Sequence, residues 1–390
     1  MKKILIVNNN MKVGGVQKSL YNLLWALDAR GGYDVTLLLF SKTGAYLEAL
    51  PKGIHVVECG GPFRYLGRSQ GEYASRRKDA LVRGFYAAVA RLCGRRAAIR
   101  LMGLTQPKWN GHYDCAVSFL HNGRRKAFYG GTQDYVLDWV SADRKVAFLH
   151  GDYGRCGANH PANNRMMARF DAIAACSDGC RQSFVTALPQ LADRCFTVRN
   201  CHRYDELARL AATDAPTYDA DAVHAVLVAR LTHEKGVDRA ITAVAEANAR
   251  GVAVHLHVVG DGPLRGELAQ QAAHLGVDAA VHFYGEQTNP YRYVQPADFL
   301  LVSSYHEAAP MVIDEALSLG VPVLTTATTS SEEMVTARHG GWVCENTQTS
   351  LTDTLIRVAS DPMQLAAVRS SLTQGGDNRT ALEQLDRICG

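Results

Sequence analysis

Short apolar runs alternate with amphipathic helical patterns along the first part of the chain. The seven runs are Lys3–Asn8, Asp34–Phe40, Ile54–Cys59, Asp114–Leu120, Arg144–His150, Asp171–Cys176 and Cys195–Asn200. Parallel strands are covered by helices on both faces, so they are apolar throughout rather than alternating. The pattern therefore predicts an α/β domain built on a parallel sheet.

A second series of the same kind follows a polar linker candidate, Leu207–Asp221. Its runs are Ala222–Ala229, Val252–Gly260, Ala280–Gly285, Asp298–Ser304 and Val321–Thr326. Two successive series predict two Rossmann-like domains that face one another across a cleft. We place the first domain at 1–205 and the second at 206–375. A C-terminal helix at about 376–390 could pack back on the first domain.

The composition is that of a soluble globular chain with room for two cores, since 47% of its 390 residues are hydrophobic and 21% are charged. A net charge of +4 gives no indication of nucleic-acid binding. The ten cysteines lack zinc-ligand spacing, which favours buried thiols in a reducing compartment. The N-terminal sequence MKKILIVNNN has too few consecutive apolar residues for a signal peptide. No apolar run in the chain is long enough for a membrane-spanning helix. We therefore expect a cytoplasmic protein.

One segment, Gly61–Asn110, is strongly basic, with eleven Lys or Arg and two acids. Within it, Arg76–Leu104 has the pattern of an amphipathic basic helix. Its apolar stripe consists of Leu81, Phe85, Val89 and Leu92. Such a helix suits an anionic membrane surface and would bring the protein to the inner face of the membrane. Two alternatives stay open: a core-packed helix with a solvated basic face, and basic side chains that line a cleft for an anionic acceptor.

The segment SSYHEAAPMVIDEALSLGVPVLT carries two acids, Glu307 and Glu315, between two predicted strands. Pro310 favours a helix start, and Gly320 favours its end. The acids therefore lie at the carboxyl end of a strand and in the helix that follows, where open α/β sheets bind ligands. Eight helical residues span about 12 Å. Because the two carboxyl groups of a glycosidase lie within roughly 10 Å of each other, this spacing suits two parts of a long ligand better.

Two glycine turns also follow predicted strands. Gly14 and Gly15 precede a helix after the first strand, and such glycines let the backbone approach a phosphate closely. Gly260 and Gly262, in VVGDGPLRGEL, resemble half of a dinucleotide fingerprint whose third glycine is displaced to Gly266. Either turn alone is a weak signal, because glycine turns are common.

Three further side chains occupy equivalent positions after strands. Arg230 and Lys235, in VARLTHEKG, form a cation pair that could neutralise a diphosphate. The alternative is a pair of ordinary surface cations. His150 ends a strand in the segment AFLHGDYG. A lone histidine usually has a structural role, so His150 is a candidate site residue only in combination with the other motifs.

In this order, the motifs resemble those of retaining GT-B glycosyltransferases of the family-4 type. The likeness is strongest over Ala225–Thr326, which contains VLVARLTHEKG, VVGDGP, HFYGE and the E-x7-E segment HEAAPMVIDEALSLGVPV. The resemblance implies that Arg230 and Lys235 contact the donor diphosphate. It also implies that Glu315 binds the nucleotide ribose and that Glu307 lies beside the donor sugar.

For the glycines and the histidine the resemblance implies further roles. Gly14 and Gly15 would meet the donor phosphates from the opposite domain, and Gly260 and Gly262 would complete the nucleotide site. His150 would lie near the donor sugar. No metal ligand and no cofactor is implied, and the donor would be a UDP-sugar or a GDP-sugar.

Some positions depart from the family pattern. The family often has glycine after the first glutamate, whereas this chain has Ala308, whose methyl group would narrow the sugar pocket or shift the turn. The usual proline–glutamate pair after the last strand is replaced by Ser331–Glu333. Asp219 and Asp221 match the acidic metal motif of the other glycosyltransferase fold, but they lie in the polar linker, so we expect no metal there.

The predicted protein is a metal-independent hexosyltransferase that retains anomeric configuration. It would move a sugar from a nucleoside-diphosphate sugar to a hydroxyl of a glycan or lipid-linked acceptor, in surface polysaccharide synthesis. Cations and helix N-termini would stabilise the leaving diphosphate. The alternatives are a dinucleotide-dependent oxidoreductase and a catalytically inactive GT-B partner subunit.

Overall fold

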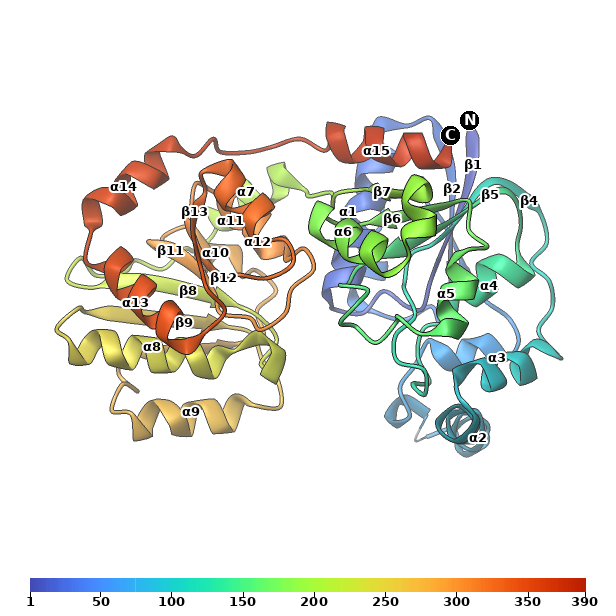
Figure 1. Cartoon of the computed structure of the whole chain (residues 1–390), viewed down its shortest axis with the longest axis horizontal. Coiled ribbons are helices and arrows are strands. Elements are labelled where there is room, and N and C mark those ends of the chain that lie inside the picture. The colour runs from blue at the N-terminus through green and yellow to red at the C-terminus, as the bar shows by residue number, and fades with distance from the viewer. Residues whose placement is uncertain (74) are drawn as a thin grey trace. The chain divides into compact units, whose positions relative to one another are not determined.

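The computed structural model describes residues 1–73 and 75–390 and divides them into two compact units (Figure 1). Unit 1 comprises Met1–His202 together with Asn378–Gly390, and unit 2 comprises Arg203–Asp377. The chain therefore leaves unit 1 once and returns to it with its final helix. Each unit contains one parallel sheet, and the two sheets are separate.

Unit 1 has a seven-stranded sheet in the order β3-β2-β1-β4-β5-β6-β7, with every pair parallel. Its strands are β1 Lys2–Asn8, β2 Tyr33–Leu39, β3 His55–Glu58, β4 His112–Ser118, β5 Ser141–Leu149, β6 Ala172–Ala175 and β7 Cys195–Thr197. Its α-helices are α1 Gly15–Arg30, α2 Arg77–Cys93, α3 Arg95–Gly103, α4 Thr132–Trp139, α5 Pro161–Met167, α6 Asp178–Ala187 and α15 Arg379–Cys389. Each apolar run predicted in the first series overlaps one of these strands, although β1, β2, β4 and β5 begin before their runs do.

The C-terminal helix α15 belongs to the core of unit 1. Its Leu385 and Ile388 are buried in the same cluster as Leu24 of α1. Asp386 accepts two hydrogen bonds from the Arg30 guanidinium, at 2.8 and 2.9 Å. Apolar burial and a bidentate ion pair therefore hold the end of the chain on the first unit.

Unit 2 has a six-stranded parallel sheet in the order β10-β9-β8-β11-β12-β13. Its strands are β8 Val223–Val228, β9 Val254–Val259, β10 Val281–Gly285, β11 Phe299–Val302, β12 Val323–Thr326 and β13 Gly341–Cys344. Its α-helices are α7 Tyr204–Ala211, α8 Val237–Ala249, α9 Arg265–His274, α10 Tyr291–Val294, α11 Met311–Ser318, α12 Ser331–Met334, α13 Gln348–Ala359 and α14 Pro362–Ser371. The apolar pattern predicted five of these strands and missed β13, which is four residues long and mostly half-buried.

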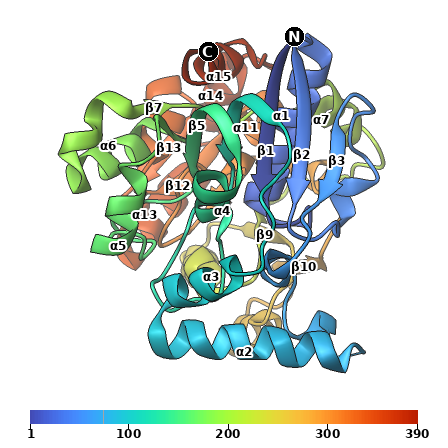
Figure 2. The ribbon, with the colours of Figure 1, turned by 90° about the vertical axis from the view of Figure 1, so that its right-hand side faces the viewer.

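The predicted basic helix Arg76–Leu104 is two helices, α2 and α3, which meet at Gly94 (Figure 2). Gly94 has a φ of 91°, which ends the first helix and turns the chain. Phe85 of the predicted apolar stripe is 57% exposed, and its neighbours along the stripe, Leu81 and Leu92, are 74% and 77% exposed. The alternative of a helix with its apolar face packed in the core is therefore wrong for this stripe.

Candidate functional site

The carboxyl ends of β8, β11, β12 and β13 are neighbours at one edge of the unit 2 sheet, because these strands are adjacent and parallel. The loops that follow them carry most of the predicted site residues. Free backbone N–H groups and helix N-termini also gather at such an edge, which makes it the usual ligand site of an α/β sheet. This edge is the candidate site of unit 2.

Glu307 and Lys235 form an ion pair at this edge. The Lys235 Nζ donates to Glu307 Oε1 at 2.7 Å, and the Ser304 Oγ donates to the same oxygen at 2.7 Å. The Glu307 side chain is 12% exposed and the Lys235 side chain 27%. From the sequence, Lys235 is expected to contact the diphosphate of the donor and Glu307 its sugar. In the structure the charged groups of the two side chains are in direct contact.

Glu315 lies apart from this pair, within α11. It is 8% exposed, and its Oε1 accepts a hydrogen bond from the Tyr291 hydroxyl at 3.1 Å. The residue before the helix, Pro310, is the N-cap rather than the first helical residue that the sequence suggested. The two glutamates therefore occupy different environments: one is paired with a cation and the other is bonded to a phenol.

Arg230 is the second residue after β8 and is exposed. The glycines of the next loop shape the segment that carries it. A Cβ added to Gly260 would lie 1.9 Å from the carbonyl oxygen of Ala229, and one added to Gly262 would lie 2.4 Å from that of Leu231. Close packing of two loops therefore accounts for both glycines without a ligand, which is a different reason from the predicted approach to a nucleotide.

Two residues that the sequence analysis missed, Arg239 and Asn346, tie these loops together. Arg239 is 3% exposed, donates to Asn346 Oδ1 at 2.7 Å and lies over the Tyr305 ring at 4.6 Å. Asn346 Nδ2 in turn donates to the carbonyl oxygens of Tyr305 and Ala327, at 3.0 and 3.1 Å. We call this pair the Arg239–Asn346 clasp. No local motif marks it, because its members are 107 positions apart.

Two predicted residues of unit 1, Gly14 and Gly15, lie at the start of α1. Among the described residues, no side chain caps this helix and its first turn holds no acid. Gly15 is exposed, and a Cβ added there would meet nothing within 4 Å. The first N–H groups of α1 and the positive end of its dipole therefore carry no side-chain counter-charge.

His150 follows β5, and its ring packs 4.6 Å from the Phe119 ring and 5.7 Å from that of Phe148. Burial, reinforced by the neighbouring His121, lowers the pKa of His150 to about 3. Its Nε2 is buried without a hydrogen-bond partner among the described residues. The imidazole is therefore neutral at ordinary pH, and it can offer a hydrogen bond but no charge.

Within residues 1–73 and 75–390, no group of three or more His, Cys, Asp or Glu side chains is arranged to hold a metal ion. Over the same residues, no helix is both long and apolar enough to cross a membrane.

With this geometry established, comparison with known proteins identifies the class. Residues 217–376, which carry Arg230, Lys235, Glu307 and Glu315, match the family described as glycosyl transferases group 1. The match agrees with the resemblance found in the sequence, and it applies to this segment of the chain. The matched residues cover most of unit 2 and include every loop of its candidate site.

Individual relatives agree. The chain is 30% identical over 158 residues to the lipopolysaccharide core biosynthesis glycosyltransferase LpsD of Rhizobium meliloti, covering 40% of this chain and 44% of that protein. It is 27% identical over 186 residues to a GDP-mannose-dependent phosphatidylinositol dimannoside mannosyltransferase of Mycobacterium tuberculosis, covering 46% and 47% of the two chains. The matches thus span less than half of these curated relatives.

Solved structures match the whole chain. The Anabaena protein HepE, in complex with UDP and glucose, superposes with a TM-score of 0.65 at 19% identity, covering 99% of each chain. Identity at this level shows the fold alone. Together with the two parallel sheets, the match confirms the GT-B fold class predicted from the sequence.

Proposed function

We propose that this protein is a glycosyltransferase that moves a hexosyl group from a nucleoside-diphosphate sugar to a hydroxyl of a glycan or lipid-linked acceptor in surface polysaccharide synthesis. The observation that carries the proposal is the Lys235–Glu307 ion pair, with Glu315 eight residues on, inside a group 1 glycosyltransferase domain. The relatives named for lipopolysaccharide and phosphatidylinositol glycosylation support the acceptor class.

The chemistry needs a stabilised leaving group, because two phosphates gain charge as the sugar bond breaks. In this proposal Lys235 and Arg230, which lie in the loop after β8 at the carboxyl edge of unit 2, contact the donor diphosphate and stabilise its developing charge. In this proposal the cations do this work without a metal. The acceptor hydroxyl attacks the anomeric carbon on the face that the diphosphate leaves, so the configuration is retained.

Slow hydrolysis of donors tests this proposal without a known acceptor. The protein is incubated with UDP- and GDP-hexoses, with and without EDTA, and nucleoside diphosphate release is measured. We expect release from one base class that EDTA does not reduce, and proton NMR should show the donor's anomer forming first. Release of the inverted anomer would contradict retention, and no release from any donor would contradict the activity.

The oxidoreductase remains the second candidate because both units contain a parallel sheet. The structure gives it little support, since Gly260 and Gly262 are accounted for by packing against Ala229 and Leu231. An inactive partner subunit is the third candidate. It predicts that nucleotide binds without turnover in the unmodified protein, whereas the proposed enzyme shows both.

We also propose that α2 contacts an anionic membrane from the cytoplasmic side. Leu81, Phe85, Ala88 and Leu92 are all exposed and follow the i, i+4, i+7, i+11 spacing of one helix face. Arg77, Lys78 and Arg91 of the same helix are also exposed. An apolar stripe beside exposed cations complements an anionic lipid surface.

Sedimentation with vesicles tests the contact. We expect the protein to bind vesicles that contain phosphatidylglycerol and to bind phosphatidylcholine vesicles much more weakly. The double variant L81E/F85E should lose the binding, whereas K3Q/K52Q, which alters exposed positions elsewhere in unit 1, should keep it. Equal binding by L81E/F85E and the unmodified protein would contradict the assignment of α2.

A further inference from the structure

Three segments of unit 1 converge beyond the carboxyl ends of β4 and β5. The two strands are neighbours, so the β4–α4 loop (119–131) and the β5–α5 loop (150–160) leave the sheet at the same edge. The start of α3 joins them, because the Arg95 backbone N–H donates to the carbonyl oxygen of Arg125 at 2.9 Å. The three segments can therefore form one surface.

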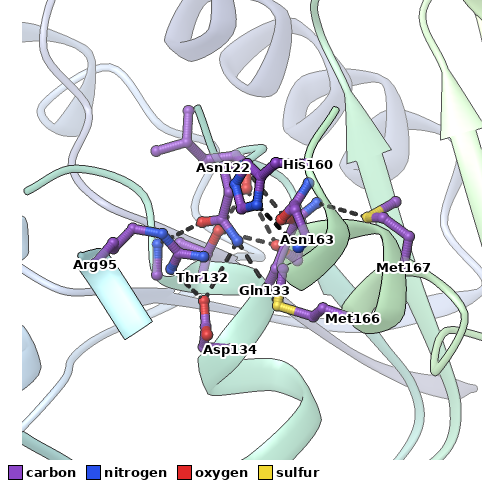
Figure 3. Close-up of polar contacts among 12 residues, drawn as sticks. Arg95, Asn122, Thr132, Gln133, Asp134, His160, Asn163, Met166 and Met167 are labelled. Carbon is purple, nitrogen blue, oxygen red and sulfur yellow. Dashed lines mark hydrogen bonds and ion pairs between the residues drawn. The ribbon is translucent and has the colours of Figure 1, made fainter. Parts of the chain in front are cut away.

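A buried polar network fixes the shape of these segments (Figure 3). The Arg95 guanidinium pairs with the Asp134 carboxylate at 2.5 Å, and both residues are buried, at 3% and 6% exposure. Asn122, 1% exposed, donates to Asp134 at 3.3 Å and accepts from the Gly131 N–H at 2.9 Å. The Asp134 carboxylate is therefore paired with Arg95 inside the network and, among the residues that the structure describes, forms no ion pair with the cations outside it.

Apart from Arg155, which pairs with Asp152 of the same loop at 4.0 Å, the cations outside the network are Arg96, Arg124, Arg125 and Lys126. Arg124, Arg125 and Lys126 are exposed, and Arg96 is partly so. Within the described residues none of these four forms an ion pair with a carboxylate. The surface therefore carries an excess of positive charge that the protein itself leaves uncompensated.

Two glycines lie beside the arginines. A Cβ added to Gly157 would lie 2.8 Å from Arg124 Cγ, and one added to Gly94 would lie 3.8 Å from Arg125 Nε. Arg124 therefore lies against the β5–α5 loop and Arg125 beside the start of α3, which places both arginines where the three segments meet.

His160, at the end of the β5–α5 loop, lies in the field of these arginines. Its pKa is lowered first by burial and then by the charges of Arg95, Arg125 and Arg96. Its Nδ1 accepts the backbone N–H of Asn163, while its Nε2 is buried without a partner among the described residues. A neutral imidazole with an Nε2 hydrogen can donate to an anion there.

We propose that this surface binds a phosphate group carried by the acceptor, with Arg124 and Arg125 as the principal ligands and Arg96 and His160 beside them. The inference rests on the proposed function, because it names the chemical class of that function's acceptor. Guanidinium groups suit phosphate through paired, charge-assisted hydrogen bonds. Two neighbouring arginines where three segments meet favour a discrete phosphate over a diffuse membrane charge.

Binding can be followed locally through Cys93, which is exposed and adjoins Gly94. Cys156 is half-buried and the other cysteines are buried, so a polarity-sensitive maleimide dye in a C156S background would label Cys93. The labelled full-length protein is titrated with glucose 6-phosphate, with glucose, and with phosphatidylglycerol vesicles. We compare R124Q/R125Q with K3Q/K52Q, a matched loss of two positive charges elsewhere in unit 1.

We expect a saturable response to glucose 6-phosphate and none to glucose. The response should weaken at least about tenfold in R124Q/R125Q, since two charge-assisted hydrogen bonds are lost, and should be unchanged in K3Q/K52Q. An equal response to both sugars, or an unaffected R124Q/R125Q variant, overturns the inference. The absence of a response to glucose 6-phosphate also overturns it, whatever the vesicles do, because Cys93 ends α2 and its dye also reports the proposed membrane contact of that helix.

The readout separates this inference from the proposed function, because it requires no donor chemistry. A phosphate response in a protein that releases no nucleoside diphosphate would contradict the proposed function alone. Release of nucleoside diphosphate with no phosphate response would contradict this inference alone.

Discussion

Glu307 is the residue whose surroundings say most about the proposed chemistry. Its carboxylate accepts hydrogen bonds from Lys235 and Ser304, each at 2.7 Å, and is largely shielded from water. A diphosphate that binds Lys235 competes with Glu307 for the same ammonium group. Donor binding and the orientation of Glu307 are therefore coupled, whereas Glu315 is held separately by Tyr291.

The two glutamates should respond differently to neutral substitution. If Glu307 lies beside the donor sugar as proposed, E307Q removes a charge from the active site, so we expect donor turnover to fall about 10²- to 10³-fold, the usual cost of one electrostatic group there. Nucleotide affinity should change little. E315Q is the matched control, and it should weaken nucleotide binding in calorimetry. Unchanged turnover in E307Q would remove its assigned role.

The Arg239–Asn346 clasp gives a second prediction at this scale. R239K keeps the charge but loses the stacking on Tyr305 and the geometry of the bond to Asn346. Loss of a charge-assisted hydrogen bond costs about 1.5–3 kcal/mol, so we expect the melting temperature to fall by several degrees and turnover to fall with it. R250K, on an exposed arginine of unit 2, is the control. Unaltered melting and turnover in R239K would show that the clasp does not hold the loops.

The strand, turn and helix pattern of the sequence singled out Glu307, Glu315 and Lys235, because it places them after strands; their roles in donor binding stay predictions. It could not find Arg239 and Asn346, because their contact depends on how α8 and the loop after β13 pack. It also could not show the packing at Gly260, where the carbonyl oxygen of Ala229 lies 1.9 Å from the position of an added Cβ.

At the scale of elements, β8, β9 and β10 carry a row of four histidines on one face of their sheet. His224 pairs in register with His255, and His257 with His282. His224 Nδ1 lies 2.9 Å from His257 Nε2, and His255 Nδ1 lies 3.1 Å from His282 Nε2. Tyr284 bonds His257 at 2.9 Å. Neutral imidazoles can share hydrogen bonds in this row, whereas charged ones would repel.

This row makes unit 2 sensitive to acid. Burial and the charges of the other histidines lower the pKa of His257 to about 3, although exposed Asp219 opposes this. In the unfolded chain His257 has a pKa of about 6.5. Below that pH the unfolded chain binds a proton at His257, whereas the folded chain does not. Stability is therefore present above that value and falls as the pH drops toward 3.

Urea unfolding at pH 7.5 and pH 5.0 measures the effect. His257 alone should lower the free energy of unfolding by about 2 kcal/mol between these values. The variant H257Q lacks this titration and should show a smaller loss. An equal loss in H257Q and in the unmodified protein would show that the row is not the source.

The element scale also shows where patterns fail. The predicted helix over Arg76–Leu104 is interrupted because Gly94 adopts a positive φ, which an apolar periodicity does not register. β13 was missed because its four residues are mostly half-buried and begin with Gly341, so they form no continuous apolar run. The equally short β11 and β12 were predicted, since all four residues of each are buried.

At the scale of the whole molecule, the sequence indicates the function of unit 2 more clearly than that of unit 1. Unit 2 is one continuous segment, Arg203–Asp377, and the family match covers residues 217–376 within it. Unit 1 is assembled from both ends of the chain and is matched through its fold. The proposed donor half could therefore be predicted residue by residue. The surface formed by Arg124 and Arg125 could not, because three separate segments of unit 1 build it.

Nucleotide binding is the measurement that tests the central claim most directly. UDP, GDP, ADP, NAD and NADP are each added, with and without EDTA, and the unfolding of the protein is followed. We predict that one nucleoside diphosphate stabilises it by about 2.7 kcal/mol at 100 times its dissociation constant, with or without EDTA. E315Q should reduce that shift. Stabilisation by NAD or NADP, with none from any nucleoside diphosphate, would contradict the glycosyltransferase account.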